Sequence, residues 1–122
     1  MKKQELNPLV LAFVGDAYWT LYIRELVVKQ ELAKVGALHI RANKHVCAAA
    51  QARFFEILAP HLTETERNIA ARARNADTHA APKGCSLAEY KYATAFEAVI
   101  GYNYLIQDIE RLNTLLKEIN LC

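Results

Sequence analysis

Two acidic residues lie in apolar surroundings that are unusual for a carboxylate. Asp16 occurs in the run LAFVGDAY (residues 11–18), and Glu97 occurs in the run AFEAVIGY (residues 95–102). A buried carboxylate costs several kcal/mol unless it is paired or binds a cation, and neither run contains a basic residue. We therefore expect both acids to be buried, to meet in the folded chain and to share a metal ion.

Two plainer interpretations stay open for each acid taken alone. Asp16 could be a structural or helix-capping residue. Glu97 could form an ion pair with a core arginine such as Arg24 or Arg53. The elements that carry the acids must decide between these interpretations and a metal site.

The composition favours helices as those elements. Hydrophobic residues make up 53% of the 122-residue chain, which contains only 4 Gly and 3 Pro, and no stretch alternates between apolar and polar residues as a strand does. A chain of this length can bury one core. We predict an all-α fold and a single domain over residues 1–122.

Helix signals divide the chain into segments. Asn7 and Pro8 begin a first helix that runs to about residue 30, because Asn is a good N-cap and Pro suits the first helical position. An alanine-rich second helix is predicted from about residue 38 to 58. Capping boxes open two more helices, Asp108 precedes an amphipathic last helix, and residues 76–85 have the composition of a loop. The two boxes are Thr63–Glu66 and Ser86–Glu89.

The helix that carries Glu97 is apolar on nearly all sides, which is typical of a buried helix. Thr94, Glu97 and Gly101 share one side of it, and Gly15 precedes Asp16. Small residues allow another backbone or a ligand to come close. We also expect this helix, with the aromatic Tyr18–Trp19 region, to offer surface for a second copy of the chain.

These segments resemble the ribonuclease III family. The runs FVGDA (13–17) and FEAVIG (96–101) look like its pair of catalytic segments, and the similarity covers nearly the whole chain. It is closest to the Mini-III branch, which has the nuclease domain and no double-stranded-RNA-binding domain. Other matching segments are Leu38–His39, Val46–Ala48 with Gln51–Ala52, Arg72–Ala76, Pro82–Lys83 and Tyr90–Tyr92.

Two departures from the larger members of the family support the branch assignment. Those members have two further acids in the site, at the positions that Ala12 and Thr94 occupy in this chain. Mini-III members show the same simplification.

The resemblance implies a metal-dependent endoribonuclease. Mg²⁺, with Mn²⁺ as an alternative ion, would be held by Asp16 and Glu97 as catalytic residues, since Mg²⁺ prefers oxygen ligands and completes its shell with water and phosphate. Tyr90 and Thr94 could orient these ligands. The products would carry 5′-phosphate ends, and a two-fold homodimer would present one site to each strand of an RNA duplex.

The expected substrate is double-stranded RNA, in particular the precursor of large-subunit (23S) ribosomal RNA, with a ribosomal protein as a possible partner. Basic and polar residues that could contact its backbone are Arg72, Arg74, Asn75, Lys83 and Lys44. The alternative is a non-catalytic helical dimer that binds structured RNA or a ribosomal partner. A third reading is a purely structural helical dimer whose acids pair with arginines.

The remaining features concern the compartment. Cys47, Cys85 and Cys122 form no Cys-x-x-Cys motif, which fits a reducing compartment better than a disulfide framework. Cys47 is expected to be a small core residue. The N-terminal segment lacks a signal-peptide pattern, and Asp16 interrupts the first apolar run. We expect a cytoplasmic protein with no membrane partner.

Overall fold

The computed structural model describes residues 2–30, 34–76 and 81–121, and every regular element in these ranges is helical. The predicted all-α fold is therefore confirmed. The elements in chain order are η1 (Lys3–Glu5), α1 (Pro8–Lys29), α2 (Val35–Val46), α3 (Ala48–Leu58), η2 (Ala59–His61), α4 (Glu64–Arg74), α5 (Leu87–Leu105) and α6 (Ile109–Ile119).

The predicted helix starts are confirmed by their capping hydrogen bonds. The Asn7 side chain accepts a bond from the Leu9 amide at 2.8 Å, and Asp108 accepts one from the Arg111 amide at 3.0 Å. Both capping boxes are reciprocal, with Ser86–Glu89 opening the helix that carries Glu97. Each cap satisfies amide groups that have no partner within the helix.

The prediction of one helix over residues 38–58 is wrong, because the chain breaks at Cys47. This residue is extended (φ −64°, ψ 157°) and separates α2 from α3. Side-chain donors satisfy carbonyls at the end of α2: Trp19 Nε1 bonds the His45 oxygen at 2.8 Å and Gln51 Nε2 bonds the Val46 oxygen at 3.0 Å. Neither Gly nor Pro marks the break, and Cys47 is exposed, not part of the core.

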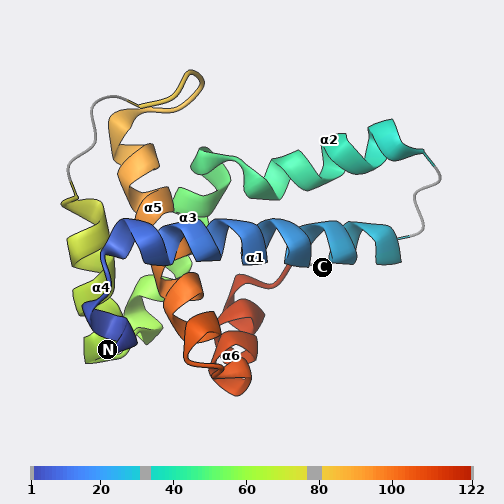
Figure 1. Cartoon of the computed structure of the whole chain (residues 1–122). Coiled ribbons are helices and arrows are strands. Elements are labelled where there is room, and N and C mark those ends of the chain that lie inside the picture. The colour runs from blue at the N-terminus through green and yellow to red at the C-terminus, as the bar shows by residue number, and fades with distance from the viewer. Residues whose placement is uncertain (1, 31–33, 77–80, 122) are drawn as a thin grey trace.

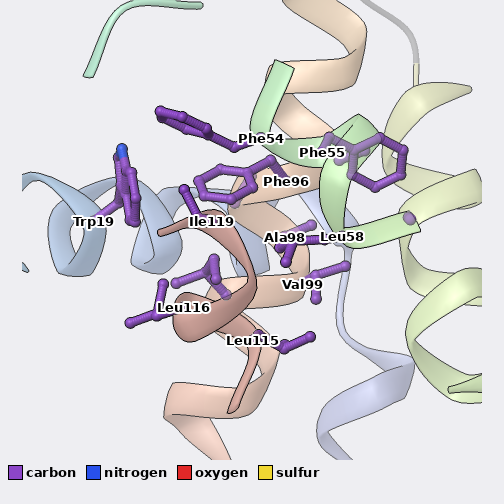
Figure 2. Close-up of a cluster of buried hydrophobic side chains, with 14 of the residues drawn as sticks. Trp19, Phe54, Phe55, Leu58, Phe96, Ala98, Val99, Leu115, Leu116 and Ile119 are labelled. Atoms are coloured by element: carbon purple, nitrogen blue, oxygen red, sulfur yellow. The ribbon is translucent and has the colours of Figure 1, made fainter. Parts of the chain in front are cut away.

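Helix α5 is the central element of the fold. It packs against α1, α3, α4 and α6, and Figure 1 shows it crossing the N-terminal half of α1 while α2 lies along the C-terminal half. Trp19 and Phe96 meet edge to face, with ring centroids 4.9 Å apart, in the core drawn in Figure 2. Trp19 is 0% exposed, and Ala95, Phe96, Ala98, Val99 and Ile100 of α5 are buried, so the expectation that Trp19 and this apolar part of α5 serve a second copy is wrong.

A buried ion pair joins α4 to α5 and α6. Glu66 accepts bonds from Arg111, the shortest at 2.6 Å, and from the Asn103 amide at 2.8 Å. Burial alone would raise the pKa of Glu66, but these bonds, with one from the Thr63 backbone, hold that pKa below its usual value. The pair thus fixes the C-terminal end of α5 relative to α4 and α6.

The predicted loop of residues 76–85 lies partly outside the described residues, which resume at residue 81. In the described part, Gly84 has φ +94°, a left-handed conformation that favours glycine. No helix within the described ranges combines the length and the hydropathy needed to cross a membrane.

Candidate active site

Two glycines allow the helices that carry the acids to touch through their backbones. A β-carbon on Gly15 would lie 1.7 Å from the Glu97 carbonyl oxygen, and a β-carbon on Gly101 would lie 1.9 Å from the Leu11 carbonyl oxygen. Such distances exclude any side chain at either position. The small side of α5 predicted from the sequence therefore receives another backbone, that of α1.

This crossing brings Asp16 and Glu97 together, as the sequence predicted. Their carboxyl groups share a hydrogen bond, and burial, then the bond and charge of Asp16, raise the pKa of Glu97 to about 8. Glu97 is half-buried, but Asp16 is exposed, so the expectation that both are buried is wrong for Asp16. None of the ion pairs within the described residues involves either acid, and Arg24 and Arg53 are exposed.

Gln51 is a third member of the site that the sequence analysis did not select. Its side chain is 2% exposed and hydrogen-bonds Glu97, which opposes the rise in the pKa of Glu97. It also donates to the Val46 oxygen at 3.0 Å. The available signal in the sequence was a lone glutamine in an alanine-rich helix, since an amide buried there needs hydrogen-bond partners. The break at Cys47, which supplies one of these partners, was not predicted.

Glu97 lines a cleft of ≈ 310 Å³, which lies between the start of α3, the turn at residues 82–85 and α5. Lys83, Tyr90 and Thr94, three of the predicted site residues, line this cleft with Glu97 and Gln51. The Thr94 hydroxyl donates to the Tyr90 carbonyl oxygen at 2.9 Å. The lining of the cleft thus combines a carboxylate, an amide and a lysine, which suits a charged ligand.

The other four residues predicted to contact RNA do not line this cleft. Arg72 donates to the carbonyl oxygens of Gln4 and Leu6 and so holds the N-terminal segment. Arg74 lies over the Tyr92 ring, 5.7 Å from its centroid. Asn75 is the exposed C-cap of α4, and Lys44 is exposed on α2. Contact of these residues with RNA remains a prediction.

The Asp16–Glu97 pair suits a small divalent cation. Two carboxylates that share a hydrogen bond compete for one proton, and a cation can replace that proton. Among residues 2–30, 34–76 and 81–121, no group of three or more His, Cys, Asp or Glu side chains is placed to hold a metal. A site with two carboxylates matches the preference of Mg²⁺, which completes its shell with water and phosphate.

An exposed apolar stripe runs along α1 beside Asp16. Phe13 is 79% exposed and Leu21 is 64% exposed. The stripe, as the name is used below, consists of Val10, Phe13, Ala17 and Leu21. These residues recur every three or four positions and so share one side of the helix. Contiguous exposed apolar surface of this kind marks interaction sites.

Comparison with known proteins shows the family of the chain. The profile of the Ribonuclease III domain matches residues 9–108. "Mini-ribonuclease 3" of Thermoanaerobacter sp. (strain X514) is 45% identical over 92% of this chain and 79% of its own length. The same-named protein of Symbiobacterium thermophilum is 43% identical over 92% and 86%.

The fold is also that of a solved structure. The crystal structure of a Fusobacterium nucleatum protein superimposes with a TM-score of 0.87 at 32% identity, covering 95% of this chain and 94% of that one. The matched domain includes both Asp16 and Glu97. The chain therefore belongs to the ribonuclease III family, in its Mini-III branch.

Proposed function

We propose that this chain is a Mg²⁺-dependent endoribonuclease that cleaves double-stranded RNA and leaves 5′-phosphate ends. The observation that carries the proposal is the Asp16–Glu97 pair, of which Glu97 lines an open cleft. The relatives named Mini-ribonuclease 3 support the same reaction class.

Asp16 and Glu97 would hold the cation. A bound Mg²⁺, or Mn²⁺ in its place, would supply positive charge that makes the phosphodiester easier for water to attack. Glu97 must release its proton before it can act as a ligand, because its pKa is raised to about 8 in the protein alone.

The residues around Glu97 favour its charged form and attract the phosphate of the substrate. The Gln51 amide hydrogen-bonds Glu97 and favours its charged form. Lys83 adds a positive charge to the cleft, which attracts a phosphate. Thr94 and Tyr90, linked by their own hydrogen bond, shape the wall next to Glu97 and could orient the ligands.

The working unit is proposed to be a homodimer that forms through the apolar stripe of α1. The stripe lies beside Asp16, so a two-fold axis through it would set two acid pairs near each other. An RNA duplex has two strands of opposite polarity, and such a dimer would offer one site to each strand.

The natural substrate is proposed to be a duplex in the precursor of large-subunit (23S) ribosomal RNA, as the Mini-III resemblance implies. A ribosomal protein that presents this RNA is the proposed helper. The small net charge of +2 is consistent with weak, salt-sensitive binding of duplex by the enzyme alone.

Incubation with end-labelled RNA tests the proposal. The protein should cut a long duplex in Mg²⁺, spare the matching single strand and leave the duplex intact in EDTA. Product ends should be substrates for a 5′-phosphate-dependent exonuclease. Binding of duplex without cleavage in Mg²⁺ or Mn²⁺ would instead favour a non-catalytic RNA-binding dimer.

A further inference from the structure

A second hollow lies along α1 and shares one lining residue with the Glu97 cleft. This groove has a volume of ≈ 370 Å³ and lies between α1 and α2, where Thr20, Arg24, His39, Asn43 and Val46 line it. Val46 also lines the Glu97 cleft, so the two hollows adjoin at the end of α2. A ligand chain that occupies the cleft can therefore extend into the groove.

The lining of the groove suits an anionic ligand that also carries hydrogen-bonding groups. It offers a guanidinium, an imidazole, an amide and a hydroxyl, and it includes no Asp or Glu. Arg24 is exposed, and no ion pair of the described residues involves it. Its charge is thus available to a partner outside the chain.

Helix α2, which forms one side of the groove, adds positive charge. Helix α2 contains Arg41 and Lys44 and no acidic residue. The pKa of His45 is lowered by burial and then by the charges of Arg41, Lys44 and Arg53, so these cations act together at the end of α2 nearest the cleft. Such a field draws in a polyanion and repels a cationic partner.

The spacing along α1 connects the groove to the acids. Thr20 and Arg24 follow Asp16 at steps of four residues, so they occupy the next two turns, within about 12 Å of Asp16 along the helix axis. Duplex RNA presents phosphates and 2′-hydroxyls at its surface, and proteins recognise it mainly through these groups.

We infer that the α1–α2 groove binds the sugar–phosphate backbone of the substrate duplex on one side of the cut. Arg24 and His39 contact phosphates, while Thr20 and Asn43 hydrogen-bond phosphate or 2′-hydroxyl oxygens. This inference rests on the proposed function and adds to it a fixed direction: the enzyme needs duplex on the α2 side of the scissile bond.

A second copy of the chain fits the polar part of the groove less well. Beyond Arg24 the surface changes to Val27, Val28, Val35 and Leu38, so the polar groups are confined to the end near the acids. A copy docked over them would bury the Arg24 guanidinium, and the groove lining offers no carboxylate to pair with it. Burial of an unpaired charge is unfavourable.

Binding of a fixed-length RNA duplex in EDTA, over a range of salt concentrations, tests this inference. Arg24→Gln should weaken binding and reduce the slope of log K against log salt by about 1, as loss of one phosphate contact does. Asn43→Ala with His39→Ala should weaken binding as well. Lys117→Gln removes the same charge from an exposed position on α6 and should leave the slope unchanged.

The possible failures are distinguishable. If wild-type protein cuts duplex in Mg²⁺ but Arg24→Gln and Lys117→Gln have the same affinity and slope, the groove is not an RNA site and the inference is wrong. If Arg24→Gln alters the sedimentation coefficient of the free protein and leaves RNA affinity intact, a second copy occupies the groove. If wild-type protein neither binds nor cuts duplex, the proposed function itself has failed.

Discussion

Gly15 and Gly101 face each other where α1 crosses α5. A β-carbon on Gly15 would lie 2.9 Å from the Gly101 nitrogen, and a β-carbon on Gly101 would lie 2.8 Å from the Gly15 nitrogen. Because Asp16 follows Gly15 and Glu97 lies one turn before Gly101, this backbone contact sets how close the two carboxylates come. The site thus depends on two residues that carry no functional group.

Gly15→Ala should destabilise the protein and separate the acids. The added methyl meets backbone atoms of α5, which cannot rotate away as a flexible side chain can, so we expect a loss of about 3 kcal/mol or more in the free energy of unfolding. Urea denaturation measures this change.

Gly36→Ala is the matched control for that substitution. A β-carbon at Gly36 meets no atom within 4 Å, and Gly36 lies in α2, so alanine should be neutral or stabilise by up to about 1 kcal/mol. Equal effects of the two substitutions would contradict the proposed crossing.

The stability of the metal-free protein should fall as pH rises from 6 to 9. The pKa of Glu97 is about 8 in the folded chain against the ordinary value of 4.5, so in this window the folded state binds a proton that the unfolded state has released. Stability then decreases with pH until Glu97 ionises. The depressed pKa of Glu66 acts only at lower pH.

Urea unfolding in EDTA at both ends of that window checks the prediction. Glu97→Gln lacks the titrating proton, so the decline of its stability with pH should be smaller than that of the wild type by on the order of 1–3 kcal/mol, after allowance for solvent screening. Identical pH profiles for the two proteins would show that the pKa of Glu97 is not raised in the folded chain.

Gln51→Leu should raise the pKa of Glu97 further. The Gln51 hydrogen bond favours the charged form of Glu97, and leucine cannot replace it. The titration of Glu97, followed by carboxyl-carbon NMR, should shift upward, and Mg²⁺ affinity measured by calorimetry at pH 7 should fall because more protein holds the competing proton. Gln30→Leu, at the exposed end of α1, should change neither quantity.

Sequence reasoning was most successful where local chemistry fixes the structure. The caps at Asn7, Thr63, Ser86 and Asp108 depend on a few neighbouring residues, and all four form as predicted. The break at Cys47 depends on hydrogen-bond donors from other helices, including Trp19, and no local sequence pattern predicts it. Gln51 was not predicted as a site residue because its partners are also set by tertiary structure.

For the two acids, the sequence predicted their pairing but not the exposure of Asp16. Their apolar sequence neighbours predicted a shared location, and the pairing of Asp16 with Glu97 bears this out. The exposure of Asp16 did not follow from its neighbours, because part of the apolar run around it forms an exposed stripe and not a core. Trp19 was mistaken for surface because an aromatic residue at this spacing fits either a core or an interface.

Phe13→Glu should prevent dimer formation without unfolding the chain. Phe13 is 79% exposed, so glutamate costs little in the monomer but would place a charge in an apolar interface. Analytical ultracentrifugation should give a dimer for the wild type and a monomer for the variant. Ile57→Glu, the same kind of change at an exposed residue of α3, should leave the dimer intact. A monomeric wild type would refute the stripe as an interface.

The most direct test of the proposed site is the single-turnover cleavage rate of duplex RNA in Mg²⁺ for four proteins: wild type, Asp16→Asn, Glu97→Gln and Glu56→Gln. The two site variants should stay folded, at equal or higher stability in EDTA, and lose cleavage. Glu56→Gln, the same change at an exposed residue of α3, should cut at the wild-type rate. Cleavage at that rate by either site variant would contradict the assignment of Asp16 and Glu97.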